Sequence, residues 1–339
     1  MSGRLLSAHL RRGPFAAILG LACLACLAAC GQEGTTATST GSGTTTSGSG
    51  GAGGGTGGEG GSLPPPVPVT IVDWNTHNFF DTINDNPNGD VLTKTQYVKK
   101  RQTIGAVLAE LNADVVVLAE VETKNILVDL NKNELSSDYG TVELIDGNDA
   151  RGIDIGLLSK IKPDAIISHK DEFFQSSETK ASYQYSRDCL EVHLTVNGRK
   201  LVLLGSHLKA KEPTDNPDKR FAEAEHTRAI ADAITKKDPA TAVLILGDLN
   251  DVPGSPPLKA IAGKAPSLYV DAADAAPADQ RYSFVYQGTK ELIDHQMQSP
   301  LLAKMLDPAS VLIKHGPGVD DSSAAASDHA PIRATYLVR

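Results

Sequence analysis

The sequence predicts an α/β protein of four layers, α/β/β/α, in which two mixed β-sheets lie between flanking helices. Three observations predict it. Short apolar runs such as "ADVVVLAEV" (113–121) and "TAVLILGD" (241–248) recur along the chain between helical patterns. Several of these runs are apolar on both faces, so their sheets must be covered on both sides. A sandwich of two sheets between helices meets this need more easily than a single open sheet.

Residues 1–29 have the pattern of a secretory signal. Residues 1–12 carry three arginines and no acidic residue, and the apolar run "FAAILGLACLACLAA" follows. This run is short for a membrane span. It ends in "LAAC", which resembles a bacterial lipobox and implies that Cys30 is lipidated, whereas an ordinary cleaved signal or a membrane anchor lacks this ending. The resemblance implies an exported lipoprotein in the outer membrane or at the cell surface, held by a lipid anchor.

Residues 30–66 predict a flexible tether. After Cys30 this stretch is rich in Gly, Ser and Thr, and it closes with three prolines. As a random coil it would reach about 35 Å. The globular part is then residues 67–339, or 273 residues (339 − 66), within the range of one large α/β domain. We expect this domain to be a monomer.

Charge and cysteine content limit the function. Without the leader and tether the domain has 29 basic residues (32 − 3) and 39 acidic ones (41 − 2), a net charge near −10. The chain has no basic run interleaved with aromatic residues, which argues against non-specific coating of a polyanion but not against contact with a few phosphates. Cys189 is the one cysteine of the domain, and we expect it to be a small apolar filler, not a nucleophile.

The elements of the domain follow from apolar periodicity. Strands are expected at 67–74, 113–121, 152–159, 200–207 and 241–248, and helices at 94–111, 124–134 and 221–236. Asn197-Gly198 lies between two apolar runs and predicts a hairpin turn.

Polar residues follow the carboxyl ends of these strands. Each residue alone also fits a purely structural role. Asp248 fits an Asx-turn, Glu120 a solvent-exposed strand end, and His207 a core histidine with its hydrogen bonds made inside the protein. Together they predict one polar rim. Its members are Asn75, Asn78, Glu120, Glu122, His207, Asp248, Asn250, Asp294, Asp328 and His329.

At these residues the chain resembles the endonuclease/exonuclease/phosphatase superfamily, which includes deoxyribonucleases, abasic-site endonucleases, inositol polyphosphate 5-phosphatases and neutral sphingomyelinases. "WNTHNFFD" is similar to the "NVENLFD" start of a bacterial branch, "LAEVE" to its "LQEVE", and "GSHLKAK" to its "NHLKSK". "GDLND", "IDH" and "SDHAP" match the remaining landmarks in the family's order. The resemblance spans residues 69–338 and implies the same four-layer fold.

The resemblance also implies roles for the rim residues. Glu120 would bind the metal, with Asp328 contributing and Asn75 positioning metal or phosphate. His329 would be the general base and Asp294 its orienting acid, while Asn250 and His207 would donate to the phosphoryl oxygens. Asp248 would align the attacking water or protonate the leaving group, and the sequence leaves both roles open.

In-line cleavage of a phosphate ester needs an activated water and stabilisation of the charge on the phosphoryl oxygens. A hard divalent cation held by few carboxylates supplies the second. Since neither H-E-x-x-H nor paired C-x-x-C occurs, we expect Mg²⁺ as the cofactor, with Mn²⁺ or Ca²⁺ as alternatives.

Several residues have weaker signals. Arg151 in "RGIDIGLLS" and Lys211, with Lys209, after His207 are candidates for substrate binding, against surface turns and solvated loops. Arg228 is expected to pair with Glu223 or Glu225. Gln296 and Gln298 share a strand face with Asp294, which predicts a wet neighbourhood for the catalytic histidine. The acidic loop 81–90 lacks the spacing of an EF-hand, so a solvated loop is favoured over a Ca²⁺ site.

Three hypotheses follow. The leading one is a surface-tethered, Mg²⁺-dependent phosphoesterase: most favoured is a nuclease or other phosphodiesterase, with a phosphomonoesterase or a sphingomyelinase-like head-group phosphodiesterase as the alternative. The others are a non-catalytic protein that binds phosphorylated ligands, and a structural surface protein. The substrate is a phosphate ester in a nucleic acid, a small molecule or a lipid head group, and the sequence does not choose among them.

Overall fold

The structure, a computed structural model, describes residues 64–211, 214–286, 288–316, 319 and 326–339. The predicted signal peptide, Cys30 and the tether up to residue 63 lie outside the described residues. The described part belongs to one compact unit, Gly60–Arg339. Within it, no helix combines the length and the apolarity needed to cross a membrane.

Two six-stranded sheets form the centre of this unit. The first has the order β15-β16-β1-β2-β4-β3, and its strands are β1 (Val67–Phe79), β2 (Val115–Val121), β3 (Thr141–Leu144), β4 (Asp154–Ser159), β15 (Leu306–Ile313) and β16 (Ile332–Val338). The second has the order β11-β14-β10-β9-β8-β5, with β5 (Ala165–Ser168), β8 (Cys189–Val196), β9 (Arg199–Ser206), β10 (Ala242–Asp248), β11 (Val270–Asp271) and β14 (Asp294–Gln298). Both sheets are mixed, because β1 pairs parallel with β2 and β9 with β10, while the other pairings are antiparallel.

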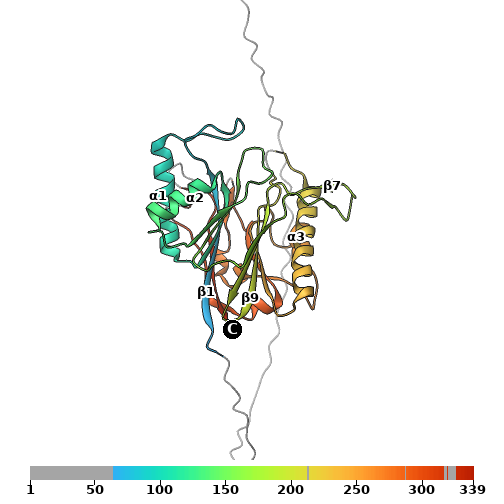
Figure 1. The fold of residues 1–339 in the computed structure, drawn as a ribbon. Coiled ribbons are helices and arrows are strands. Elements are labelled where there is room, and N and C mark those ends of the chain that lie inside the picture. Colours follow the sequence, from blue (N-terminus) through green and yellow to red (C-terminus); the bar gives the residue numbers. More distant parts are fainter. Residues whose placement is uncertain (1–63, 212–213, 287, 317–318, 320–325) are drawn as a thin grey trace, which may run out of the picture. The chain divides into compact units, whose positions relative to one another are not determined.

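Helices cover the outer faces of the two sheets. Figure 1 shows α1 (Lys94–Leu111) and α2 (Lys124–Glu134) on one side, α3 (Pro217–Lys237) on the other, and the sheets between them. The shorter helix α4 (Pro256–Ala262) packs beside α3, and α5 (Pro300–Ala303) follows β14. Two 3₁₀ turns complete the helical segments, η1 (Ala272–Ala275) and η2 (Ala278–Gln280). The predicted four-layer α/β/β/α sandwich is confirmed.

Local sequence signals explain where these elements begin and end. Helix α1 starts with a capping box between Thr93 and Gln96 and stops at Asn112, which adopts a left-handed conformation. Helix α3 begins at Pro217, four residues before the predicted start, because a proline is well suited to the first turn. The predicted hairpin joins β8 to β9, and both Asn197 (φ 52°) and Gly198 (φ 76°) have the positive φ that a type I′ turn requires.

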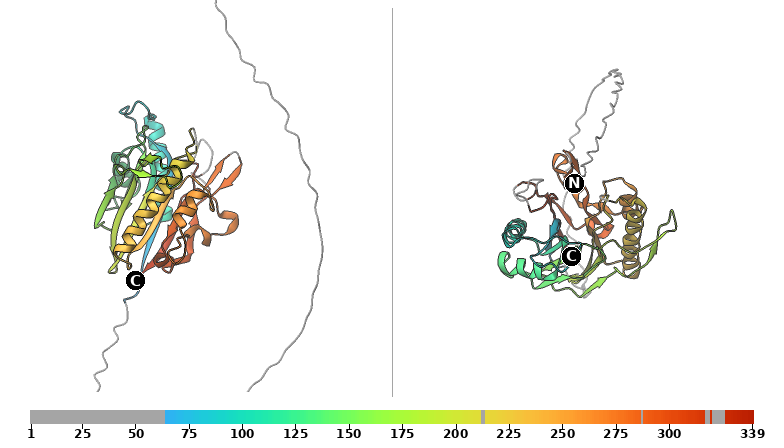
Figure 2. Two further views of the ribbon diagram at one scale, coloured as in Figure 1. Left: turned by 90° about the vertical axis from the view of Figure 1, so that its right-hand side faces the viewer. Right: turned by 90° about the horizontal axis from the view of Figure 1, so that it is seen from above.

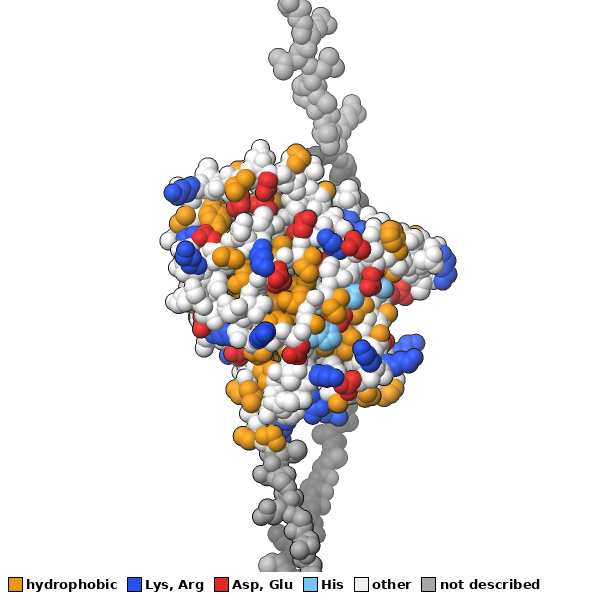
Figure 3. Space-filling view, viewed as in Figure 1, with side chains coloured by type: hydrophobic (Ala, Val, Ile, Leu, Met, Phe, Trp, Pro, Cys, Tyr) orange, Lys and Arg blue, Asp and Glu red, His pale blue; other side chains and the backbone are white. Residues whose placement is uncertain are grey.

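Two small hairpins stand outside the main sheets. One pairs β6 (Phe174–Gln175) with β7 (Ser182–Tyr183), and Figure 1 shows β7 beside one end of α3. The other pairs β12 (Phe284–Tyr286) with β13 (Thr289–Glu291), and it projects sideways in the left view of Figure 2. On the face seen in Figure 3, acidic and basic side chains are interspersed, in keeping with the mixed charge of the sequence.

The main core fills the space between the two sheets and contains one polar cluster. Gln296 is fully buried there: its Nε2 donates to Oδ1 of Asp73 (2.7 Å) and to the carbonyl of Ile332 (3.1 Å), and its Oε1 accepts from the hydroxyl of Tyr336 (3.1 Å). Burial, and then the nearby charge of Asp294, raise the pKa of Asp73 well above its usual range. Protein groups therefore satisfy the side chain of Gln296, whereas both polar side-chain atoms of Gln298 are buried without a partner among the described residues, and the wet neighbourhood of His329 stays a prediction.

Candidate active site

A hollow of about 480 Å³ opens at one rim of the sandwich. It lies where the parallel pairs β1–β2 and β9–β10 end, so the polar residues that follow these strands meet there. Ten residues were given a catalytic, metal-binding or substrate-binding role from the sequence. Eight of them line the hollow: Asn75, Glu120, Arg151, His207, Asp248, Asn250, Asp328 and His329.

Asp294 is the ninth predicted residue, and it lies directly behind His329. The Nδ1 atom of His329 donates to Oδ2 of Asp294 at 2.7 Å, and both residues are buried. The backbone of His329 is held by Trp74, whose indole nitrogen donates to the His329 carbonyl at 2.7 Å. Ser327 ties the same loop to β1 through a hydrogen bond from its hydroxyl to the carbonyl of Asn75 (2.6 Å).

The charges around this pair shift the pKa values of its members. Burial lowers the pKa of His329, but Asp294, followed by Asp248 and Asp328, outweighs it and raises that pKa to about 10. Burial, and then the nearby Asp294, raise the pKa of Asp248 to about 7. A general base that is neutral at neutral pH was expected at His329. Three carboxylates instead favour the protonated form of its imidazole.

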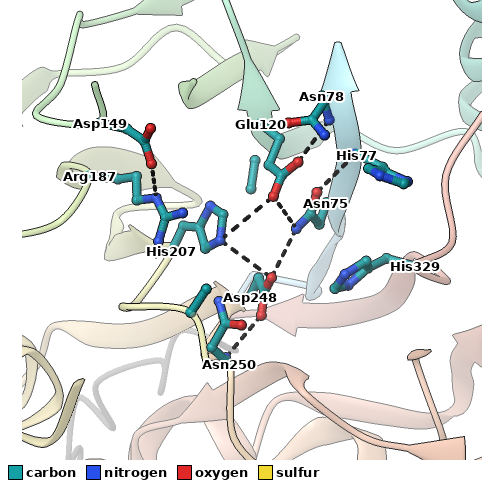
Figure 4. A network of polar contacts seen from close by, with 12 residues as sticks. Asn75, His77, Asn78, Glu120, Asp149, Arg187, His207, Asp248, Asn250 and His329 are labelled. Atoms are coloured by element: carbon teal, nitrogen blue, oxygen red, sulfur yellow. Dashed lines mark hydrogen bonds and ion pairs between the residues drawn. The ribbon is translucent and has the colours of Figure 1, made fainter. Parts of the chain in front are cut away.

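Asn75 connects the two sheets at the floor of the hollow. Its side-chain nitrogen donates to Oδ2 of Asp248 (2.9 Å) and, more weakly, to Oε1 of Glu120 (3.3 Å), as Figure 4 shows. Nε2 of His207 lies 3.4 Å from the same Asp248 oxygen. Burial, and then the positive charge of Arg187, lower the pKa of His207 well below its usual range, so its imidazole is neutral. A neutral His207 can donate one hydrogen bond into the hollow.

The turn after β10 requires glycine at its start. Gly247 has φ 122°, and a Cβ atom there would lie 2.3 Å from the carbonyl oxygen of Ser206. Asp248 then accepts a hydrogen bond from the backbone of Asn250 (2.9 Å), as the predicted Asx-turn requires. The side-chain nitrogen of Asn250 donates to the carbonyl of Leu208 (3.1 Å), which leaves its second N–H for a ligand.

Glu120 sits in a strained part of the backbone. It has φ 63°, and His77 (φ 51°) and Asn78 (φ 57°) opposite it are also left-handed. The backbone N–H of Asn78 donates to Oε2 of Glu120 at 2.7 Å, so the strained turn orients the carboxylate. Non-glycine residues in this conformation are uncommon and cluster at functional sites.

The predicted metal ligands fit a hard cation. Glu120, Asp328 and Asn75 all line the hollow, and the first two offer carboxylates to a cation. The amide oxygen of Asn75 accepts from the backbone N–H of His77 at 2.9 Å, and its amide nitrogen faces Glu120. The side chain of Lys100 lies near both carboxylates. Burial lowers its pKa to about 8, while the charges of Glu120 and Asp328 raise that pKa. His77 lies 3.0 Å from Asp328 and lowers the pKa of that carboxyl, although burial acts in the opposite direction.

Among the described residues, one group of three has ligand atoms within 4.8 Å of one another: Asp248, Asp294 and His329. This group could also hold a metal. However, Nδ1 of His329 is already bonded to Asp294, so we assign the three residues to proton transfer.

Three positively charged residues, Arg151, Arg187 and Lys209, are among those that line the hollow. Arg151 donates to Oδ1 of Asn78 (3.3 Å) and pairs with Asp149, which also binds Arg187 at 2.8 Å. The tenth predicted residue, Lys211, does not line the hollow: its Nζ lies 3.5 Å from Oδ1 of Asp251. Its neighbour Lys209 lines the wall instead.

The sequence prediction missed Arg187, Asp149, His77 and Phe284, which all line the hollow. The ring of Phe284 lies 4.8 Å from that of His329, measured between centroids. Arg187, Asp149 and Phe284 do not follow a predicted strand, so the rule that located the other residues could not find them. His77 follows the strand predicted at 67–74, between Asn75 and Asn78, and the rule did locate its position. The pairing of Arg187 with Asp149 has no local sequence signal.

Two weaker predictions are also decided, and a third, the solvated acidic loop, stays a prediction. Arg228 pairs with Asp232 and donates to the carbonyls of Ile261 and Ala262, so the expected partners Glu223 and Glu225 are wrong. Cys189 is buried, and burial raises the pKa of its thiol to about 12, as expected of a filler. In the acidic loop, Asp81 caps its own backbone by accepting from the N–H of Ile83 (2.6 Å).

Comparisons with known proteins identify the family and the fold. A family model described as "Endonuclease/Exonuclease/phosphatase family" matches residues 70–314. No curated protein sequence gave a significant match. Among solved structures, truncated TDP2 of Caenorhabditis elegans is similar at TM-score 0.55 and 18% identity, covering 80% of this chain and 98% of that one.

Two further structures have the same fold. A family protein of Bacteroides thetaiotaomicron has TM-score 0.54 and 13% identity, covering 80% of this chain and 98% of its own. D. rerio TDP2, complexed with a single-strand DNA product, has TM-score 0.51 and 18% identity, covering 79% and 98%. The chain belongs to the endonuclease/exonuclease/phosphatase family, whose members are hydrolases acting on phosphate esters.

Proposed function

We propose that this protein is a divalent-metal-dependent phosphodiesterase, tethered outside the cytoplasm by a lipid on Cys30. The observation that carries the catalytic part is the buried Asp294–His329 pair facing Asp248 in the hollow that Glu120 also lines. A protein that only binds phosphorylated ligands has no need of a histidine with its own orienting acid. The full catalytic set therefore favours an enzyme over the binding and structural alternatives.

The residues divide the chemistry by position. Arg151 and the remaining N–H groups of Asn250 and His207 point donors at the phosphoryl oxygens, where negative charge builds in the transition state. The Asp294–His329 pair and Asp248 move the two protons of the reaction, one from the attacking water and one to the leaving oxygen.

Glu120 and Asp328 would hold the cation, and Asn75 would position it through its hydrogen bond to Glu120. When bound, a Mg²⁺ ion neutralises charge on the phosphoryl oxygens and positions the substrate. Mn²⁺ or Ca²⁺ suits the same oxygen ligands and is the alternative to Mg²⁺.

A diester is the favoured substrate class, with a nucleic acid first. D. rerio TDP2 was solved with a single-strand DNA product, which supports this choice by analogy of fold. The deciding experiment compares bis-p-nitrophenyl phosphate with p-nitrophenyl phosphate in Mg²⁺, at matched concentrations. Faster release of nitrophenol from the diester supports the proposal, faster release from the monoester favours a phosphatase, and no release with any divalent metal contradicts it.

A further inference from the structure

A second hollow of about 610 Å³ adjoins the catalytic one. The two share Asp149, Arg187 and Lys209 as a common wall. The far wall of the second hollow includes Phe173, next to β6, and Lys219, in the first turn of α3. Nothing in the proposed catalytic reaction uses either residue.

The β6–β7 hairpin that borders this hollow is anchored to α3. The carboxylate of Asp218 accepts hydrogen bonds from the hydroxyls of Ser176 (2.6 Å), Thr179 (2.6 Å) and Tyr183 (2.8 Å). Glu225, two turns further along the helix, accepts from the backbone N–H of Ser177 at 3.0 Å. A hairpin held at four points on a helix presents its side chains in a defined place.

Phe173, the residue before β6, is the large apolar side chain that is exposed to solvent beside this hairpin. Phe173 is 74% exposed, the largest exposed fraction among the large apolar side chains of the described residues. Its neighbour Phe174 turns inward instead, is 7% exposed and packs 5.0 Å from the ring of Tyr185. One phenylalanine therefore anchors the segment while the next stands free at the edge of the hollow, where an aromatic ligand can stack on it.

The wall between the hollows is positively charged, although the chain as a whole carries a net charge of −9. Burial, and then the charge of Arg187, lower the pKa of Lys209, and Lys219 and Arg220 act in the same direction. Glu223, which is buried, accepts from the backbone N–H groups of Ser186 and Lys209, both at 2.6 Å, and lies 4.0 Å from Nζ of Lys219. Within the shared wall, Arg187 and Lys209 outnumber the one carboxylate, Asp149. This wall therefore attracts anions.

We propose that the second hollow binds a single-stranded nucleic acid next to its scissile phosphate, with a base stacked on Phe173 and a neighbouring phosphate beside Lys209 and Lys219. Stacking platforms combined with basic walls are how proteins hold single strands without reading their sequence. An inositol phosphate would use the lysines but not the exposed ring. This inference rests on the proposed diesterase function, because the strand must continue from the catalytic hollow.

The test compares Phe173→Ser and Lys219→Ser with two matched controls. Leu312→Ser removes another exposed apolar side chain, on β15. Lys304→Ser removes another exposed lysine, directly after α5. The substrates are a labelled 12-nucleotide thymidine strand and bis-p-nitrophenyl phosphate, which is too short to reach the second hollow. Each test variant should raise the KM for the strand at least about fivefold. It should change kcat/KM on the small diester less than twofold, and both controls should match the parent.

Three outcomes would overturn the inference while leaving the diesterase intact. They are a parental KM for the strand in both variants, an equal loss on both substrates, or a loss in Lys219→Ser alone, which would indicate a site for phosphate only. If the parent cleaves neither substrate, the proposed function fails. Fluorescence anisotropy with the same strand and no metal then decides the inference by itself: the parent must bind more tightly than both variants.

Discussion

Asp294 and His329 form a 2.7 Å hydrogen bond across 35 positions of the chain. Asp294 opens β14 of the second sheet, whereas His329 lies just before β16 of the first. The pair therefore joins the two sheets, and it exists only when they pack against each other. Since both residues are buried, the bond is protected from competing water.

The pair should act as one catalytic unit. We expect His329→Ala to lower kcat about 10²- to 10⁴-fold on a diester with little effect on KM, since its contribution arises mainly in the transition state. Asp294→Asn should also lose activity, and the double variant should be scarcely worse than His329→Ala. The measurement is kcat for both single variants and the double variant. Near-parental kcat in His329→Ala, or losses that simply multiply, would contradict the assignment.

The raised pKa of Asp248 predicts that the activity lost on its replacement depends on the leaving group. If Asp248 protonates the leaving oxygen, Asp248→Asn should lose much less activity with a nitrophenol leaving group, which needs no proton, than with an alkyl one. Rates on p-nitrophenyl and methyl esters of the same phosphate measure this difference. Equal losses on both esters would assign Asp248 to the attacking water instead.

Glu120 should control the metal requirement. EDTA should abolish activity and Mg²⁺ or Mn²⁺ restore it, and Glu120→Gln should raise the Mg²⁺ concentration for half-maximal activity at least about tenfold. Glu110→Gln, which changes an exposed glutamate that pairs with Lys314 on the outside, is the matched control. Full activity in EDTA would refute the metal-dependent mechanism.

Asp154 should make the folded protein less stable at alkaline pH. It is buried, Gly147 donates to its Oδ1 at 2.7 Å, and its Oδ2 has no hydrogen-bond partner among the described residues. Burial raises its pKa to about 7, so the folded state binds this proton more tightly than the unfolded state does. Its contribution to stability is therefore present at acidic pH and is lost as pH rises toward 7, by about 1.4 kcal/mol per pH unit.

Replacing this carboxyl removes that pH dependence. We expect the unfolding free energy of Asp154→Asn relative to the parent to rise between pH 5 and pH 8, as measured by urea denaturation at each pH. A difference that stays constant across this range would mean that Asp154 is not protonated in the folded state.

The proposed lipid anchor on Cys30 predicts in which cell fraction the protein is found. Cys30→Ser should release the protein from the membrane fraction or block removal of the signal, because serine lacks the thiol to be acylated. Fractionation and mass measurement of both forms test this, with Cys26→Ser as the matched control. If Cys30→Ser is processed and sorted like the parent, Cys30 is not the anchor.

Much of the site could be predicted because its chemistry follows the strands. Apolar runs predicted strands at 67–74 and 241–248, and the structure has β1 and β10 there. Asp248 is the last residue of β10, and Asn75 is where the regular pairing of β1 with β2 stops. Since neighbouring parallel strands end at one rim, polar residues in these positions had to meet. The prediction for Lys211 was wrong because this residue lies on a loop, where position in the sequence does not determine where a side chain points. Its Nζ pairs with Asp251 and does not line the hollow.

By itself, the sequence determined the fold class, the main elements and the residues at the strand ends, because apolar periodicity and turn chemistry are local. Only the tertiary structure decided which groups face one another. The packing of two sheets set Asp294 behind His329, surrounded that imidazole with three carboxylates and raised its pKa. The same packing buried Gln296 against Asp73 and brought Arg187 to Asp149. Electrostatic environment depends on distances between segments remote in the chain, and no local pattern encodes those distances.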